Sequence, residues 1–513
     1  MIFLKHNGKR TIAVLKEGRP LKLEFKNQAV SAACFLLAET FPDEMLVWFH
    51  EGVASNLNLE FIEKSSCELE MWSYAANRPL VIAEEMGYVD QSVFFRIQSN
   101  VKYPTWLMSG SVGSISCKTL NHFRSFLPTY ASFDLFLCVL ARVGMAKGLR
   151  AYSEPRLIKK IDDSGISFSK STNATYSAIG ALFGKKWLLL FQLQRLIYSR
   201  KMNPIQLAKT YLTKSLSYSE IPILEIDDAK RNEAESMLSF DIVIPTLGRK
   251  EVLKQTLEDL ADQSLLPQCV IIIEQNSNIA SESELDYLHN GNWPFQIKHT
   301  FTNQTGACNA RNLALNQVEA DWVFLADDDL RIPQDFLRSA NAFIQNEKPQ
   351  AFTVSCLQIG EVEQEQTIIQ WPAFGSGCSF VKASALKFIR FDMALENGFG
   401  EDADFGMQLR KSGTDVLYNP FLKLIHLKAS SGGFRKPIEN PWDSENPSPK
   451  PAPTVLASIL KHATPSQIKG YKTLLFLKFY RLQQIKNPFT YFRQMQKRWD
   501  ISLFWAKKLL NTK

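Results

Sequence analysis

The sequence predicts a layered α/β protein built from more than one domain. The chain has 513 residues, enough for two to four domains at about 100–200 residues each. Apolar residues make up 45% and charged residues 22%, close to the average for soluble globular proteins, so wholesale disorder is excluded. Residues 240–436 alternate between short apolar β-branched runs and helical patterns, as expected where helices cover a sheet.

Composition divides the chain into four predicted regions. Residues 1–160 alternate short apolar runs with turns. Residues 161–238 begin rich in Ser, Asp and Gly and continue as a helical connector. Residues 239–438 carry the alternating strand and helix patterns. Residues 439–513 begin as a Pro-rich linker and continue as a basic helical tail.

Positive charge is concentrated in that tail. The net charge is +7, whereas the segment from Pro465 onwards holds eleven Lys/Arg and one acid, or +10, which leaves 7 − 10 = −3 for the rest. A nucleic-acid role for the whole chain is therefore not indicated. Aromatic residues alternate with the basic ones, so residues 465–513 fit peripheral contact with an anionic membrane surface. The alternative is a helical hairpin, turned at Asn487-Pro488, that packs on a neighbouring domain.

The cysteines and the lack of long apolar runs predict a cytoplasmic protein. The eight cysteines form no CxxC pair and are expected to be reduced thiols in the core. The first residues hold an apolar run too short for a secretion signal, and no stretch approaches 18 uncharged apolar residues.

The first part of the third region, residues 240–326, is predicted to hold four buried strands and two helices. The first helix places Leu253, Leu257 and Leu260 on one face, and the second has Thr305 as its expected N-cap. The strands are predicted at FDIVIP (240–245), CVIIIE (269–274), QIKHTF (296–301) and DWVFLA (321–326).

Three consecutive aspartates, Asp327, Asp328 and Asp329, follow the fourth strand. Like charges at this spacing repel unless they are neutralised, and a divalent cation that also binds phosphate oxygens neutralises them. Ligands of open α/β sheets lie beyond the carboxyl ends of the strands, where these aspartates fall. The alternative is a solvated acidic turn.

Glu401 and Asp402 begin a predicted helix after a Gly-rich turn, and His426 follows a later apolar run. The helix N-terminus favours an ionised carboxylate, while neighbouring acids raise its pKa, and this combination suits a general base. A helix cap is the alternative for Asp402. His426 is either a metal ligand or a structural histidine.

These motifs together resemble family-2 glycosyltransferases with a GT-A (Rossmann-like nucleotide-sugar-binding) fold. The matching segments are VIPTLGR, VIIIEQNS, TGACNARNLAL, FLADDDLRIPQDFL, GFGEDADF and His426, in order over about 240–436. The stretch GFGEDADFGMQLRKSG is similar to the acceptor-side motif of galactosyltransferases and N-acetylgalactosaminyltransferases. The resemblance implies an inverting, metal-dependent enzyme that transfers a sugar from a nucleotide sugar, expected to be UDP-linked, to a glycan hydroxyl in surface polysaccharide synthesis.

The resemblance also implies roles for individual residues. Asp402, beside Glu401, would be the general base. Asp328, Asp329 and His426 would bind Mn²⁺ or Mg²⁺. A loop at 428–435, with Gly432 and Gly433 as hinges and Arg435 as a phosphate contact, would close over the donor. The nucleotide would be held by Pro245, Thr246, Arg249, Glu274 (where the family has an aspartate), Arg311 and Asp327.

The first region echoes the third. MLVWFHEGVASNLNLEF (45–61) aligns with WVFLADDDLRIPQDFL, which puts His50-Glu51-Gly52 in place of the three aspartates. A further alignment puts Ser132-Phe133 opposite Glu401-Asp402. We therefore expect a truncated GT-A-like domain without metal or base, which binds an acceptor or a partner subunit. Chance similarity of apolar segments is the alternative.

Two other functions fit the sequence less well. A nucleotidyltransferase also uses paired aspartates, but it normally has a Gly-rich phosphate loop, and VIPTLGRK offers only Gly248. A non-catalytic glycan-binding or scaffold protein would have little need for Asp328, Asp402 and His426. The sequence leaves open a lipid-linked acceptor and a homo-oligomer.

Overall fold

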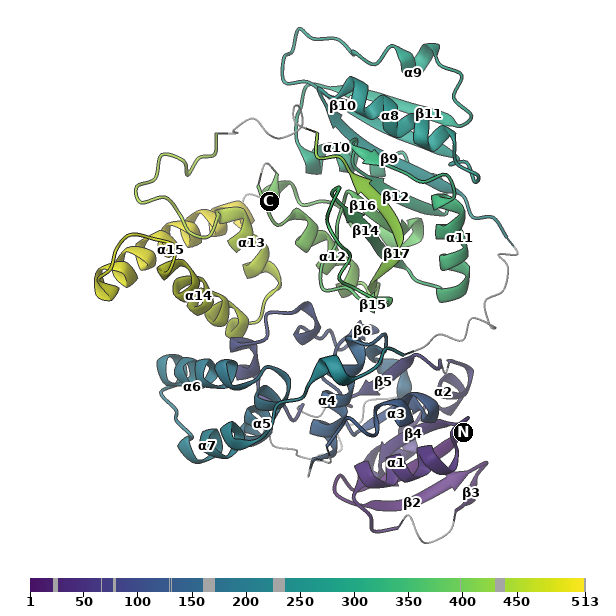
Figure 1. Ribbon diagram of the computed structural model, residues 1–513, viewed down its shortest axis with the longest axis vertical. Coiled ribbons are helices and arrows are strands. Elements are labelled where there is room, and N and C mark those ends of the chain that lie inside the picture. The colour runs from purple at the N-terminus through teal and green to yellow at the C-terminus, as the bar shows by residue number, and fades with distance from the viewer. Residues whose placement is uncertain are drawn as a thin grey trace. The chain divides into compact units, whose positions relative to one another are not determined.

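The computed structural model describes residues 1–21, 26–65, 67–76, 80–128, 130, 132–159, 171–224, 236–396, 398–429 and 439–511. These residues form two compact units, each with its own sheet (Figure 1). The first unit comprises the described residues up to 224 together with Ala463–Leu477. The second comprises those from 236 to 462 together with the described residues after 477.

The second unit contains a mixed sheet with the strand order β11-β10-β9-β12-β16-β14-β17-β13, and β15 pairs with β17. Strands β9 to β12 confirm the four predicted strands and run parallel to their neighbours among themselves. Their bounds are β9 (Phe240–Leu247), β10 (Cys269–Gln275), β11 (Gln296–Thr302), β12 (Trp322–Ala326), β13 (Leu330–Arg331), β14 (Ala351–Leu357), β15 (Ile369–Gln370), β16 (Cys378–Lys382) and β17 (Val416–His426).

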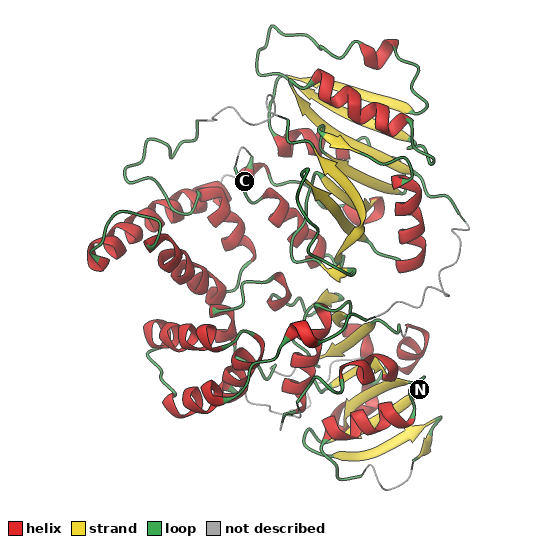
Figure 2. Ribbon diagram, viewed as in Figure 1, coloured by secondary structure: helices red, strands yellow, loops and turns green. Residues whose placement is uncertain are grey.

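Helices cover both faces of this sheet (Figure 2). Successive side chains of a strand point to opposite faces, so Ile242 and Ile244 join one buried cluster and Val243 joins the other. Helices α8 (Lys250–Ala261) and α11 (Phe336–Glu347) pack on the first cluster, and α10 (Ala307–Leu315) and α12 (Glu401–Lys411) on the second. This arrangement confirms the α/β prediction.

The N-cap predicted at Thr305 is wrong. Helix α10 begins at Ala307 with Gly306 as its N-cap residue, at φ 151°, and no side chain of the capping residue bonds the helix. The carboxylate of Glu396 accepts instead from the backbone N–H groups of Cys308 and Asn309, at 3.0 and 2.7 Å. A charged acceptor from a distant segment satisfies the free N–H groups better than a local hydroxyl.

The first unit has the strand order β3-β2-β1-β4-β7-β5-β8-β6. Helices α5 (Thr172–Leu182), α6 (Lys185–Ser199) and α7 (Pro204–Leu212) pack on one another and belong to this unit. The remaining elements used below are β1 (Ile2–His6), β2 (Thr11–Lys16), β3 (Arg19–Pro20), β4 (Met45–His50), β5 (Glu70–Tyr74), β6 (Tyr103–Pro104), β7 (Val112–Ser116), α4 (Phe133–Met145) and β8 (Arg150–Ser153).

Five strands of the two sheets correspond in order and direction. Strand β4 is parallel to β1 and antiparallel to β7, as β12 is parallel to β9 and antiparallel to β16. Residues 45–49 pair with 116–112 in the register in which 322–326 pair with 382–378. This register puts His50 at the place of Asp327. Where the second unit has the parallel strands β10 and β11, the first has the antiparallel strands β2 and β3.

The alignment of Ser132-Phe133 with Glu401-Asp402 needs a correction. Asp134 is the second residue of α4, and its Oδ1 accepts from the backbone N–H of Gly110 at 2.8 Å, two residues before β7. Asp402 is the second residue of α12 and accepts in the same way from Ser376, two residues before β16, at 3.3 Å. Asp134 therefore corresponds to Asp402, and the first unit keeps a carboxylate there.

The tail is helical, and residues 481–487, next to the turn predicted at Asn487-Pro488, interrupt it. It forms α13 (Pro453–His462), α14 (Pro465–Tyr480) and α15 (Pro488–Asn511). Tyr491, Met495 and Trp499 of α15 are buried, and α15 packs on α13. No described helix is long and apolar enough to cross a membrane. All eight cysteines are free, but Cys67 is exposed and Cys356 and Cys378 are half-buried rather than in the core.

Candidate active site

The candidate site lies at the carboxyl ends of the parallel strands of the second unit. In the register of β9 and β10, Pro245 pairs with Ile273 and Thr246 with Glu274, so these predicted residues meet at one edge of the sheet. Asp327 follows β12 at the same edge, because β12 runs parallel to β9. The strands are held there by apolar side chains that are fully buried on both faces.

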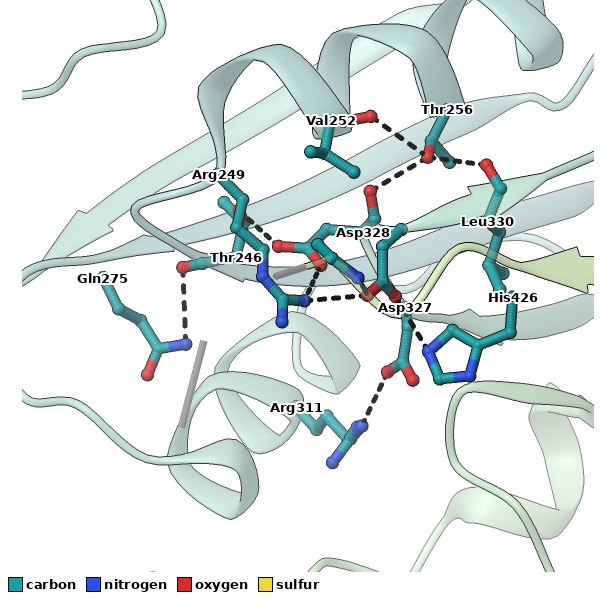
Figure 3. Close-up of polar contacts among 12 residues, drawn as sticks. Thr246, Arg249, Val252, Thr256, Gln275, Arg311, Asp327, Asp328, Leu330 and His426 are labelled. Atoms are coloured by element: carbon teal, nitrogen blue, oxygen red, sulfur yellow. Dashed lines mark hydrogen bonds and ion pairs between the residues drawn. The ribbon is translucent and has the colours of Figure 1, made fainter. Parts of the chain in front are cut away.

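Asp328 points to Thr246 and Arg249 (Figure 3). The hydroxyl of Thr246 donates to Asp328 Oδ2 at 2.7 Å, and Arg249 Nη1 donates to Asp328 Oδ1 at 2.6 Å and to Asp329 Oδ2 at 3.2 Å. Asp328 is only 3% exposed. Burial raises the pKa of Asp328 to about 6, although Arg249 and Thr246 oppose the shift.

Asp327, Asp329 and His426 form a cluster suited to a metal ion. One ligand atom from each lies within 4.8 Å of the other two. His426 Nε2 lies 3.2 Å from Asp329 Oδ1, and this hydrogen bond raises the pKa of His426. Two carboxylates and an imidazole are a donor set that Mn²⁺ accepts readily and that Mg²⁺ accepts through its oxygen atoms. The residues therefore fit a divalent cation.

The pairing of β13 with β17 brings this cluster together. Leu330 stands opposite His426 in the antiparallel register. The segment after β17 also bonds Asp329. The backbone oxygen of Asp329 accepts from the N–H of Leu427 at 2.9 Å, and Asp329 Oδ2 accepts from the N–H of Ala429 at 3.0 Å. Burial by itself would raise the pKa of Asp329, but the hydrogen bonds from His426 and Ala429 lower it. A metal set of Asp328, Asp329 and His426 was expected, whereas the structure groups Asp327 with the other two.

Arg311 lies on α10 and points to Asp327 from the opposite side, with 3.2 Å between Nη2 and Oδ1. The buried Nε of Arg311 has no hydrogen-bond acceptor among the described residues. A buried cation with an unused donor beside carboxylates suits a charged ligand such as a diphosphate.

Asp402 and Asp327 lie on either side of the turn Gly375-Ser376-Gly377. Asp402 accepts from the N–H of Ser376, and the N–H of Asp327 donates to the backbone oxygen of Gly377 at 3.2 Å. A Cβ at Gly377 would fall 2.2 Å from Asp327 Oδ2, so a larger residue at this position would displace the carboxylate of Asp327. Burial raises the pKa of Asp402, and the nearby charge of Asp327 adds to the effect. Burial, followed by the charge of Asp402, also raises the pKa of Glu401.

The carboxylate of Glu274 is hydrogen-bonded to neighbouring protein groups. It accepts from Ser283 Oγ, from the N–H of Glu284 at 3.0 Å and from His299 at 2.9 Å. It therefore ties β10 to the segment that follows β10 and to β11. The predicted loop residues Gly432, Gly433 and Arg435 lie outside the described residues.

The residues of α13 that anchor α12 were not predicted from the sequence. Asp404, fully buried, lies 2.6 Å from both His462 Nε2 and Lys461 Nζ of α13. Burial alone would raise the pKa of Asp404, but these two partners lower it. A DxxxQ pair, Asp404 and Gln408, on the helix that carries Asp402 was the one available signal, since Gln408 also bonds Asp404, at 2.6 Å.

Comparison with known proteins gives one family. Residues 241–412 match the family described as glycosyl transferase family 2. A relative, poly(ribitol-phosphate) β-N-acetylglucosaminyltransferase TarS of Staphylococcus aureus, is 24% identical over 109 residues, which are 21% of this chain and 19% of the relative. The chain thus matches about a fifth of the length of its curated relatives.

Solved structures of sugar transferases also resemble the chain. S. aureus TarS 1–349 in complex with UDP-GlcNAc has a TM-score of 0.36 and 19% identity, covering 48% of this chain and 72% of its own. GalNAc-T7 with UDP, GalNAc and Mn²⁺ has a TM-score of 0.35 and 13% identity, covering 51% of this chain and 55% of its own. The mannosyltransferase PcManGT of Pyrobaculum calidifontis with GDP-Man and Mn²⁺ has a TM-score of 0.32 and 15% identity, covering 55% of this chain and 89% of its own.

Proposed function

We propose that this chain, whose residues 241–412 form a glycosyltransferase family 2 domain, transfers a sugar from a nucleotide sugar to a glycan hydroxyl with inversion. The family match confirms the resemblance and the GT-A fold class of this region. The UDP donor, the divalent metal and the stereochemistry are our proposals. The observation that carries them is the convergence of Asp327, Asp329 and His426 near Asp402 across one glycine turn.

Donor binding is assigned to the edge of the sheet after β9, β10 and β12. Asp327, Asp329 and His426 would hold the divalent cation, which when bound offsets negative charge on the departing nucleoside diphosphate. Arg311 is placed to meet the diphosphate, because its guanidinium is buried and keeps an unused donor. Arg249, with Thr246, orients Asp328, which is buried beside the cluster.

Proton removal is assigned to Asp402. Its raised pKa makes it a stronger base than a solvated aspartate, and Glu401 beside it adds negative charge. Asp402 would accept the proton of the acceptor hydroxyl as that oxygen attacks the anomeric carbon from the face opposite the leaving group. One displacement of this kind inverts the configuration.

The setting of the reaction is also proposed. The expected acceptor is a glycan, lipid-linked or free, in surface polysaccharide synthesis, and the expected location is cytoplasmic with peripheral contact at the inner face of the membrane. Residues 465–513 remain a predicted contact with that membrane. Among its described residues, the first unit has no counterparts of β10, β11 or the three aspartates, which supports acceptor or partner binding there rather than donor binding.

A panel assay tests the proposal. Full-length protein is incubated with Mn²⁺ and each of several UDP- and GDP-sugars, and released nucleoside diphosphate is measured. We expect release from one donor class that is lost on chelation. Release of pyrophosphate when a nucleoside triphosphate and a sugar 1-phosphate replace the nucleotide sugar would indicate a nucleotidyltransferase. Donor binding without turnover would indicate a scaffold protein.

A further inference from the structure

Helix α6 of the first unit exposes a row of large apolar side chains, although it also buries Leu188 and Phe191. Leu189, Leu193, Leu196 and Ile197 are exposed, the last by 54%. Their spacing of i, i+4, i+7 and i+8 places them on one side of the helix. A surface helix normally turns such a row toward the core.

The buried side of α6 carries polar groups. Gln192, Gln194 and Arg195 are three of its five buried residues. Gln192 accepts from the hydroxyl of Tyr176, Gln194 Nε2 donates to the backbone oxygen of Tyr88 at 3.2 Å, and Arg195 Nη1 donates to Tyr176 at 3.2 Å. These bonds fix the rotation of α6, so the leucines face outward because their neighbours are held inward.

Helix α7, which packs beside α6, also exposes large apolar side chains. Ile205 is 70% exposed and Leu212 is 84% exposed, and they lie seven residues, or two turns, apart. Met202 in the connection before α7 is exposed by 62%. Figure 1 shows α6 and α7 side by side. We call the exposed residues Leu189, Leu193, Leu196, Ile197, Met202, Ile205, Tyr211 and Leu212 the α6–α7 face.

Positive charge surrounds this face. Residues 171–219 contain seven Lys/Arg and no Asp or Glu. Arg195 is buried, and the other six are exposed at both ends of the two helices: Lys185, Lys186, Arg200, Lys201, Lys209 and Lys214. Apolar side chains that project between lysines and arginines match an interface with acyl chains below and anionic headgroups around them.

We propose that the α6–α7 face inserts into the headgroup region of an anionic lipid bilayer. A symmetric contact with a second copy would bring six exposed cations against six, which opposes dimer formation through this face. The contact is separate from the basic tail, whose α15 turns Tyr491, Met495 and Trp499 inward. It holds the first unit at the membrane whatever sugar the second unit transfers.

Vesicle co-sedimentation of the full-length protein tests this proposal. We expect the protein to pellet with vesicles of phosphatidylcholine and phosphatidylglycerol, to remain in solution with phosphatidylcholine alone, and to be released by high salt. The double variant Leu193→Gln/Ile205→Gln should lower the partition coefficient at least about tenfold, since it removes two apolar side chains from the interface. Arg200→Glu/Lys201→Glu should remove the preference for anionic vesicles.

The matched control is Phe489→Gln/Phe504→Gln, which removes two exposed aromatic side chains of α15. It should keep most of the pelleting of the wild type, whereas Leu193→Gln/Ile205→Gln should lose most of it. Pelleting that is lost in this control and kept in Leu193→Gln/Ile205→Gln would assign the contact to the tail and overturn the proposal. So would absence of pelleting, equal pelleting with neutral vesicles, or a dimer in light scattering that the α6–α7 variant dissociates. Thermal unfolding midpoints equal to that of the wild type show that the variants fold.

Discussion

The hydroxyl oxygen of Thr454 accepts a hydrogen bond of 3.1 Å from the backbone N–H of Phe399. Thr454 is buried on α13, outside the matched family segment, and Phe399 lies in the turn that starts α12. A Cβ at Gly398 would lie within 2.4–2.7 Å of Thr454 side-chain atoms. The backbone of the turn thus lies directly against α13, three residues before Asp402.

Replacing Thr454 by Val should slow turnover. The variant keeps the shape of the side chain and leaves the N–H of Phe399 without an acceptor, at a cost of about 1 kcal/mol. We expect kcat to fall about tenfold through displacement of Asp402, with KM for the donor unchanged. Thr454→Ser, which keeps the hydroxyl, is the control and should restore kcat. Equal rates for Val and Ser would show that the bond does not position Asp402.

Metal affinity should depend on Asp329 more than on Asp328. Asp329→Asn weakens a ligand of the cluster, so Mn²⁺ affinity measured by calorimetry should fall at least about 100-fold, and sugar transfer with it. Asp328→Asn should change Mn²⁺ affinity only a few-fold, because that carboxylate bonds Thr246 and Arg249. Asp286→Asn, at a side chain 78% exposed, is the control. The reverse order of the two variants would return the metal to Asp328.

The rate of sugar transfer should fall on the acid side through a pKa above the usual 3.8 of aspartate, because burial raises the pKa of Asp402 and the base must be ionised. Asp402→Asn should lower kcat by about 10²–10⁴-fold. The acid-side pKa is measured from the profile of kcat/KM against pH, and the loss of kcat from the rate of the variant at saturating substrate. A profile that is flat down to pH 4 would contradict this assignment.

The raised pKa of Asp402 also predicts that Asp402→Asn, which lowers activity, raises the stability of the fold. A folded-state pKa raised above the unfolded value means that ionised Asp402 opposes folding once the pH exceeds the raised pKa. Asp402→Asn should therefore unfold at a higher temperature than the wild type at pH 7.5, and the difference should shrink as the pH falls. A lower midpoint for Asp402→Asn at pH 7.5 would mean that the ionised carboxylate stabilises the fold.

One UDP should bind per chain. Titration of the full-length protein with UDP and Mn²⁺ should give a single site, and Asp329→Asn should abolish it. The first unit has β2 and β3 in place of β10 and β11, and it has His50-Glu51-Gly52 where the second has the aspartates. A second, Asp329-independent site would show that the first unit binds nucleotide.

Apolar runs and motif order were enough to predict the strands and the edge of the sheet where the site forms. Ile242, Ile271 and Phe324, for example, lie in apolar runs that predict strands, and all three are fully buried in the sheet. Pairing between distant segments was not encoded in any local pattern. The register of Leu330 with His426 selects Asp327 and Asp329 as neighbours, and the bond from Arg249 turns Asp328 away.

Local rules failed where a distant group competed. Thr305 looked like a cap, but Glu396 supplies a charged acceptor from another segment. Asp134 was missed because the linear alignment was shifted by one residue. The N-cap residues Ser132 and Gly400 occupy the same position before α4 and α12, but they differ in sequence. The bond that the aspartate of each helix forms to the turn before the next strand identifies the equivalence only in three dimensions.

Anyone who trims this chain to its recognisable domain will meet Asp404. Cut after residue 412, the polypeptide would lose Lys461 and His462 and strand an anion in the protein interior. The shortest fragment worth expressing from the second half accordingly extends through His462, well past where sequence similarity ends.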